Sequence, residues 1–147
     1  MMKKLNIIAI FFALSSATFA QEKEHEGKES IKVPTAVKTA LATKYTDAKN
    51  VTWEKENGNY EANWGGKSGE DNSVQYTPSG NFIEIVNAMP VSQLPAKVVT
   101  YVKQHYNGAK ITEAGKVTDA KGKLSYEAEV HGKDIVFDEN GNFVKAE

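Results

Sequence analysis

The sequence predicts an α+β fold built from two similar units in tandem, each a helix followed by four antiparallel strands. Three observations predict it: a turn that occurs twice, a proline-led helix that occurs twice, and strand-like alternation after each helix. The turn Gly80-Asn81-Phe82 returns as Gly141-Asn142-Phe143, 61 positions later. We expect each antiparallel sheet to be covered on one face by one helix, so that the units form a concave open face on the other side.

Alternating apolar residues precede both copies of the turn. Val74-Gln75-Tyr76 precedes the first copy, and Ile135-Val136-Phe137 precedes the second. Successive side chains of a strand point to opposite faces, and glycine readily adopts the positive φ that tight turns need. Each copy therefore predicts a β-hairpin at the end of its unit.

A proline begins each predicted helix. Pro34 and Pro95 suit the first helical turn, where the missing N–H of proline is not needed. Apolar residues then recur four positions apart, on one helix face: Val37, Leu41 and Tyr45 in the first helix, and Val98, Val102 and Tyr106 in the second. Helices of about three turns are marginal alone, so each must pack on its sheet.

Turn signals divide the rest of each unit into strands. Asn57-Gly58-Asn59 separates two alternating stretches in the first unit, and a glycine-rich loop over 65–72 follows them. Tyr60-Glu61-Ala62 returns as Tyr126-Glu127-Ala128, at a shift of 66 rather than 61. A longer first hairpin and a shorter following loop in the second unit account for this difference, because length changes in a duplicated fold fall in turns.

The period of two assigns strand residues to the two faces of the sheet. Trp53 and Trp64 fall on the helix-covered face; on the open face they would instead be interface anchors. Phe82 and Ile85 have opposite parity, which indicates a bulge or one wrong assignment. The candidate partner-binding residues on the open face are Glu54, Glu56, Glu61, Asn63, Gln75, Glu127, Glu129 and His131.

Residues 1–20 have the features of a signal peptide. Lys3 and Lys4 precede the apolar run Leu5–Leu14, and small residues lead to Ala20. This run is shorter than the roughly 20 residues that span a bilayer, although an N-terminal membrane anchor is the alternative. The expected organisation is a signal peptide at 1–20, a disordered linker at 21–32, a first unit at 33–89 and a second unit at 90–147, the two units together making one compact domain.

The composition argues against several classes of partner and chemistry. The 147 residues carry a formal net charge of −1, contain no cysteine, and include 18 basic residues that are all lysine. Without arginine, the chain lacks the planar group that reads phosphate and guanine bidentately. Without cysteine, disulfides, thiolate nucleophiles and cysteine metal sites are excluded. We expect a monomer with no nucleic-acid partner, and no contact with the membrane after signal cleavage.

Catalytic chemistry finds little support in the sequence. The three histidines, His25, His105 and His131, are scattered, and no Gly-x-Ser-x-Gly elbow accompanies them. Glu127 and Glu129 could serve acid–base chemistry or hold calcium, but an exposed sheet face offers no pocket to shift a pKa. We predict no catalytic residue, no cofactor, no metal site and no enzyme activity.

The order of these motifs resembles the PepSY-like, beta-lactamase-inhibitor-like proteins. The resemblance rests on the signal peptide, the proline-led helices, Trp53, the repeated Tyr-Glu-Ala strand and the Gly-Asn-Phe hairpins, and it covers nearly all of the chain after Val33. It implies export by a Gram-negative bacterium and a continuous concave sheet. The family has no inhibitory motif to transfer, and the second unit has no tryptophan at the position of Trp53.

These observations predict a periplasmic or secreted, non-catalytic binding module whose partner the sequence does not identify. The first interpretation is an inhibitor or sensor that acts on an extracytoplasmic protein or peptide through the open sheet face. The alternative is a periplasmic protein that binds a small ligand, a peptide or a metal ion in the cleft between the units. A fold-level likeness alone supports neither strongly.

Overall fold

The structure, a computed structural model, describes residues 31–146. The predicted signal peptide and residues 21–30 of the predicted linker lie outside the described residues. Two α-helices, one 3₁₀ helix and eight strands follow one another: α1 (Thr35–Lys44), β1 (Thr52–Glu56), β2 (Asn59–Trp64), β3 (Asn72–Tyr76), β4 (Phe82–Ala88), η1 (Val91–Gln93), α2 (Ala96–His105), β5 (Glu113–Asp119), β6 (Leu124–Val130), β7 (Lys133–Asp138) and β8 (Phe143–Ala146).

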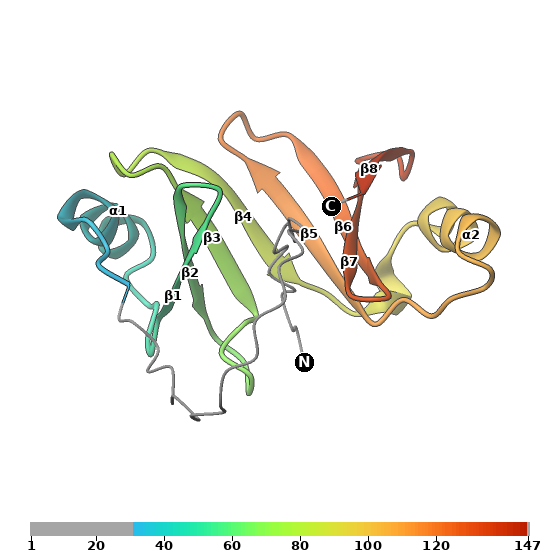
Figure 1. The fold of residues 1–147 in the computed structure, drawn as a ribbon, viewed down its shortest axis with the longest axis horizontal. Helices are drawn as coiled ribbons and strands as arrows, with labels where there is room; N and C mark the ends of the chain where they lie inside the picture. Colours follow the sequence, from blue (N-terminus) through green and yellow to red (C-terminus); the bar gives the residue numbers. More distant parts are fainter. Residues whose placement is uncertain (1–30, 147) are drawn as a thin grey trace, which may run out of the picture.

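The predicted α+β class is confirmed, but the strands form one sheet. They pair in chain order from β1 to β8 in a single antiparallel sheet (Figure 1), whereas the sequence predicted one sheet for each unit. The halves join because β4 pairs with β5, which places Val86 opposite Val117 and Asn87 opposite Lys116. This pairing satisfies backbone N–H and C=O groups that two separate sheets would leave unpaired at their inner edges.

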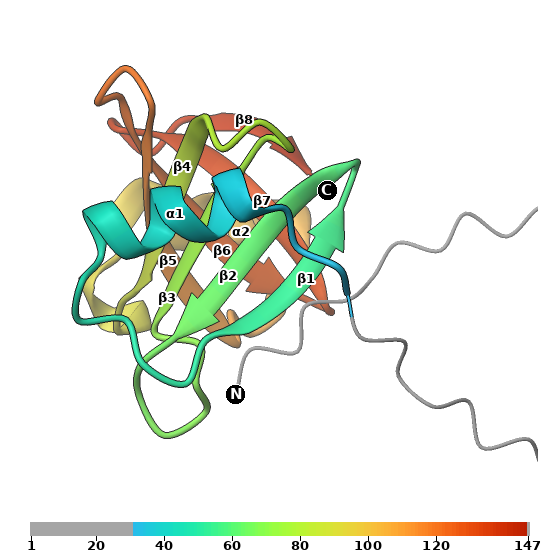
Figure 2. The ribbon, with the colours of Figure 1, turned by 90° about the vertical axis from the view of Figure 1, so that its left-hand side faces the viewer.

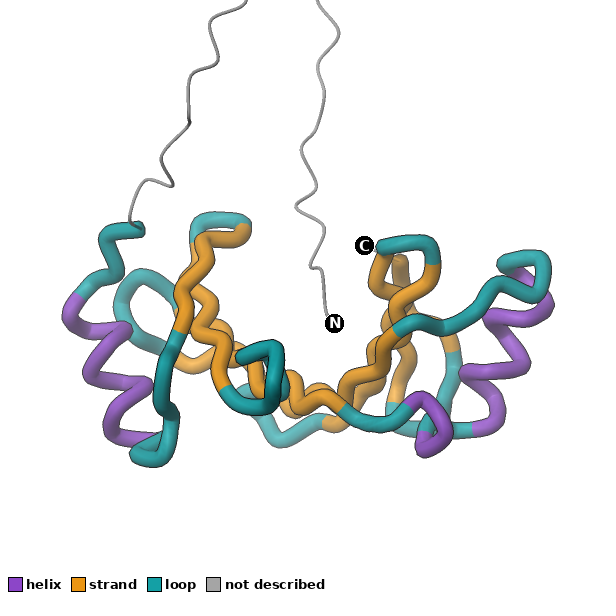
Figure 3. The backbone as a smooth tube through the Cα atoms, turned by 90° about the horizontal axis from the view of Figure 1, so that it is seen from below, coloured by secondary structure: helices purple, strands orange, loops and turns teal. Residues whose placement is uncertain are grey.

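The sheet bends into a valley, and both helices lie outside it. Figure 3 shows the strands in a U-shaped section, with α1 on one outer flank and α2 on the other. Figure 2 shows α1 lying across the strands of the first half. The inner, concave face therefore carries no helix in the described part of the chain.

Each helix packs on its own hydrophobic cluster. The buried residues of the first cluster, beneath α1, are Val33, Val37, Leu41, Tyr60, Ala62, Trp64, Val74 and Tyr76. Those of the second cluster, beneath α2, are Leu94, Val98, Val102, Ile111, Ala114, Ala128, Val130, Ile135 and Phe137. Burying each large apolar side chain stabilises the fold by about 1.5–3 kcal/mol. Several such side chains together hold each ten-residue helix on the sheet. Trp53 and Trp64 both belong to the first cluster, on the face that the alternation predicted.

The two Gly-Asn turns pack against the beginnings of the helices. A Cβ atom at Gly80 would lie 2.7 Å from the carbonyl oxygen of Ala36, in α1. A Cβ atom at Gly141 would lie 3.1 Å from the Cβ of Lys97 and 3.2 Å from the Cβ of Pro95, at the start of α2. The two glycines have φ angles of 84° and 77°. Glycine is therefore needed at each turn both for its backbone conformation and for the space it leaves.

A β-bulge explains the parity conflict found in the sequence. The register between β3 and β4 shifts near the turn, so that Ile83 is an extra residue between Phe82 and Glu84. The pairing of β7 with β8 shows the same irregularity. Because the bulge inserts one residue, both Phe82 and Ile85 reach the first cluster.

Candidate binding face of the sheet

The concave face is formed by the strand residues that alternate with the two hydrophobic clusters. Cross-strand pairing aligns five residues from β1 to β5, which we call the acidic row: Glu54, Glu61, Gln75, Glu84 and Asp119. A second set of carboxylates occupies the same face of β5, β6 and β7: Glu113, Glu127, Glu129 and Asp134. Acidic side chains from both halves of the chain therefore converge on one surface.

The structure brings most of the predicted partner-binding residues to this face. Those on it are Glu54, Glu56, Glu61, Asn63, Gln75, Glu127 and Glu129. The Nε2 of Gln75 donates a hydrogen bond to the Oε2 of Glu56 at 3.3 Å. His131 is not part of the strand face, because β6 ends at Val130 and His131, with φ of 53°, forms the turn to β7.

Part of this face is buried. Glu61 and Asn63 are 3% and 2% exposed, and Ser73 on β3 is 5% exposed. The Ser73 hydroxyl donates a hydrogen bond to the Glu61 carboxylate. Such donors offset the cost of removing a carboxylate from water. The Glu61 carboxylate therefore bonds within the sheet, and the buried Oδ1 of Asn63 has no hydrogen-bond partner among residues 31–146. Half-buried carboxylates such as Glu54 and Glu127 remain within reach of a partner.

An apolar floor lies among these carboxylates, and the sequence did not predict it. Val86 on β4 pairs with Val117 on β5, and Val136 follows on β7. All three are buried. A Cβ atom at Gly115 would lie 2.6 Å from the Cγ1 of Val86, so the floor has no room for a larger residue there. The sequence did contain a signal for this floor: the three valines alternate with the cluster residues along their strands, which assigns them to the open face.

The chemistry of the face is electrostatic. Among residues 31–146, no three histidine, aspartate or glutamate side chains come together in a way that could hold a metal ion. A backbone hydrogen bond from Lys123 holds the pKa of Asp119 below its usual value, and the side-chain amide of Asn142 does the same for the pKa of Asp138. Both carboxylates favour the charged form, which suits attraction of a cation rather than donation of a proton.

A curved antiparallel sheet with helices on its outer side alone is the class of protein that this geometry defines. The chain belongs to the family described as beta-lactamase-inhibitor-like and PepSY-like, whose model matches residues 21–84 and again residues 67–145. The family resemblance of the sequence motifs is thereby confirmed. No curated protein matches the chain. No helix within residues 31–146 has the length and apolar character needed to cross a membrane.

Solved structures with a similar fold come from Bacteroides species. A Bacteroides eggerthii protein described as periplasmic is 18% identical to this chain. The match covers 79% of this chain and 88% of the other chain, with a TM-score of 0.65. A DUF2874 family protein of Bacteroides ovatus is 17% identical, with coverages of 80% and 88% and a TM-score of 0.62. A BLIP-like protein of Bacteroides fragilis is 20% identical, with coverages of 80% and 86% and a TM-score of 0.54. At these identities the likeness concerns the fold alone.

Proposed function

We propose that this protein is an exported, non-catalytic binding module whose concave face docks a basic surface of another extracytoplasmic protein. One observation carries the proposal: a single sheet has helices on its outer side only, and carboxylates of both halves converge on its inner side. The predicted signal peptide supports export. Similar structures are described as a periplasmic protein and as a BLIP-like protein, which supports a periplasmic location and a protein partner.

The charge of the inner face supports a basic partner. Among the described strand residues of this face, Lys145 on the edge strand β8 is the one lysine. Lys55, Lys116 and Lys133 have the opposite parity and belong to the helix-covered side. Like charges on a concave surface reinforce one another's potential, steer an oppositely charged partner, and lose that effect as salt rises.

The proposal treats residues 33–89 and 90–147 as two copies of one unit, each with a helix over four strands. The separate cluster beneath each helix and the glycine turn against each helix support this view. The acidic row spans β1 to β5, so it crosses the joint between the halves. The docking face would therefore exist only when both halves are present.

Site-specific photocross-linking in intact cells tests which face meets a partner. A photoreactive residue at Gln75, on the concave face, should form an adduct with the partner. The same residue at Thr39, exposed on α1, should form none. An adduct from Thr39 with none from Gln75 would contradict the proposal.

Charge reversal tests the acidic character of the face. Changing Glu54 and Glu127 to lysine should remove the adduct formed from Gln75. The matched control changes Asp47 and Glu139, which are exposed in turns away from the face, and alters the net charge equally. The control should keep the adduct; loss of the adduct in both variants would mean that net charge, and not this face, governs binding.

A further inference from the structure

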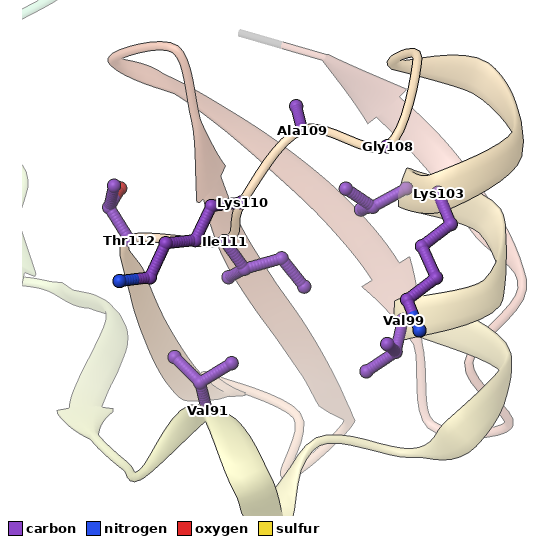
Figure 4. A pocket seen from close by; sticks show the side chains of 9 residues that line it. Val91, Val99, Lys103, Gly108, Ala109, Lys110, Ile111 and Thr112 are labelled. Atoms are coloured by element: carbon purple, nitrogen blue, oxygen red, sulfur yellow. The ribbon is translucent and has the colours of Figure 1, made fainter.

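A second concave site lies on the other side of the sheet, beside α2. It is a cleft of about 470 Å³ between α2, η1 and residues 108–112, which lead into β5. Its apolar part is formed by Val91, Val99, Val102 and Ile111, and its rim by Lys103 and Lys110 (Figure 4). This volume lies within the range of roughly 300–1,000 Å³ of small-molecule sites, which are usually apolar with a few polar groups.

Backbone hydrogen bonds fix the segment that closes one side of the cleft. The helix α2 gives way to a left-handed turn in which Asn107 and Gly108 have φ angles of 51° and 72°. The N–H of Gly108 donates to the carbonyl oxygen of Lys103 at 3.0 Å, and the N–H of Thr112 donates to the carbonyl oxygen of Glu129 at 3.0 Å. The cleft is therefore preformed, and a ligand would not need to order its walls.

The two lysines give the cleft a positive rim. Neither ammonium group makes a hydrogen bond or an ion pair with any residue of 31–146. Figure 4 shows Lys103 running down beside Val99 on α2, and Lys110 reaching toward the opposite side near Thr112. An apolar surface between two uncompensated positive charges is complementary to a molecule with a hydrocarbon part and one anionic group.

The first half of the chain repeats one part of this chemistry, because Lys49 stands 61 positions before Lys110, but it lacks the rest. Sixty-one positions earlier, Lys38 stands where the second half has Val99, and Ala42 stands where it has Lys103. Both Lys38 and Ala42 are exposed on α1. The apolar cleft with two lysines at its rim therefore belongs to the second half. Because Lys and Ala occur at the corresponding positions of α1, the same residues should be tolerated at positions 99 and 103 of α2.

We propose that this cleft binds a medium-chain aliphatic carboxylate. The hydrocarbon chain would lie against Val91, Val99 and Ile111, and the carboxylate would be held by Lys103 or Lys110. Because burial of apolar surface drives such binding, affinity should rise about fourfold with each methylene group. This site is on the side of the sheet opposite the proposed docking face, so neither proposal depends on the other.

Calorimetric titration with a short series of probes tests the chemistry of the ligand. Sodium decanoate should bind about 16-fold more tightly than sodium octanoate. Decanol has the same chain without the charge and should bind roughly tenfold more weakly than decanoate. Equal affinities for decanol and decanoate, or no binding of decanoate below its micellar concentration, would overturn the proposal.

Variants taken from the first half test the location. Val99→Lys should abolish decanoate binding, because it places a charge in the apolar part. Lys103→Ala combined with Lys110→Ala should lower decanoate affinity to that of decanol, while decanol binding stays unchanged. The double variant leaves the apolar lining intact, so it decides the matter if Val99→Lys does not fold. Lys38→Ala, on α1, is the matched control and should bind decanoate as the unaltered protein does; unchanged binding by the double variant would sink the proposal.

Discussion

The two halves of the molecule share a backbone plan but fill it with different side chains. In each half a helix is followed by four strands, and a glycine turn packs against the start of that helix. At corresponding positions, however, Tyr76 in the first cluster becomes Phe137 in the second, and Lys44 on α1 becomes His105 on α2. The contact between turn and helix is common to both halves, while the packing around it differs, as expected for cores that accept volume-conserving exchanges.

The aromatic residue that follows each turn illustrates the difference. In the first half, the Nζ of Lys44 lies 3.6 Å from the centre of the Phe82 ring. In the second half, Tyr101 stacks on Phe143 with ring centres 4.9 Å apart, and on His105 with ring centres 4.1 Å apart. A cation–π contact and ring stacking thus cover equivalent positions, which shows that the backbone plan tolerates either chemistry.

Gly80→Ala should produce the largest loss of stability. The new Cβ would meet the Ala36 carbonyl oxygen at 2.7 Å, a backbone atom that cannot move without displacing α1, and φ is 84°. We expect the free energy of unfolding to fall by about 3 kcal/mol, from backbone strain and overpacking together. Urea denaturation followed by circular dichroism measures it.

Two other glycines make this comparison sharper. Gly141→Ala should cost about 2 kcal/mol, because the neighbours of the new Cβ are side-chain carbons at 3.1 and 3.2 Å. Gly58→Ala isolates the backbone term at about 1 kcal/mol, since φ is 83° and nothing lies within 4 Å. If all three variants lose the same stability, the contact between turn and helix adds nothing to the backbone strain in either half.

Gly115→Ala should weaken the joint between the halves. Its Cβ would lie 2.6 Å from the Cγ1 of Val86 across the pairing of β4 with β5. We expect a loss of about 2 kcal/mol from overpacking, with hydrogen exchange of the Asn87 and Lys116 amides, which are paired across this joint, rising more than that of the Val74 and Ile135 amides. Uniform acceleration at all four amides would show that the halves do not open at this joint.

Tyr76→Phe should make the first cluster more like the second and stabilise it. Tyr76 is 1% exposed, and its hydroxyl has no hydrogen-bond partner among residues 31–146. Removing a buried hydroxyl that lacks a partner should raise the free energy of unfolding by about 1 kcal/mol. The second half already has a phenylalanine, Phe137, at the corresponding position. A lower urea midpoint for the variant at pH 7 would contradict this expectation.

The same substitution should change the alkaline limit of stability. Burial, followed by the charge of Tyr45, raises the pKa of Tyr76 to about 12 from its ordinary value of 10.0. The unfolded chain then loses the proton more readily than the folded one, so stability is fully present below pH 10 and falls as the pH rises toward 12. Tyr76→Phe should reduce this fall, as measured by the urea midpoint between pH 9 and pH 11.5; an unchanged fall would assign it to other tyrosines.

Helices, strands and turns could be predicted because each depends on residues close together in the chain. Pro34 and Pro95 mark the helix starts as the sequence indicated, although each is the N-cap residue just before the helix and not part of its first turn. The Gly-Asn turns lie where they were expected. The single sheet could not be derived from alternation, because the pairing of Val86 with Val117 joins residues separated by the whole of α2. The continuous sheet was implied by the family resemblance instead.

The composition of the concave face was predicted in part, for a similar reason. Period two placed Glu54 and Glu127 correctly, but it could not foresee that Glu61 is buried beside Ser73. It extended β6 to His131, whose His-Gly turn is a weaker signal than Asn-Gly. The cleft beside α2 depends on how a helix end, a 3₁₀ helix and a loop meet, which no periodicity describes.

The smallest predicted difference between the halves is their response to acid. Asp138 accepts hydrogen bonds from the side chain and the N–H of Asn142 at 2.9 and 2.8 Å, and these contacts lower its pKa. The corresponding Thr77 accepts one from the N–H of Asn81 at 3.1 Å and does not titrate in acid. Because the folded state has the lower pKa, this contribution to stability is present above the ordinary pKa of the carboxyl, 3.8, and is lost as the pH falls through the lowered value.

Amide chemical shifts between pH 6 and pH 2 should therefore change at Asn142 and not at Asn81. Asp138→Thr should remove the change at Asn142. It should leave the change at Lys123 unaffected. The N–H of Lys123 donates a hydrogen bond to the Oδ1 of Asp119 at 2.8 Å, in another turn of the second half, and lowers the pKa of that carboxyl in the same way. Two results would contradict this: an amide shift change at Asn81 as large as that at Asn142, or loss of the change at Lys123 in the variant. The acid response would then belong to the whole sheet, and the Asp138 carboxylate would not distinguish the two turns.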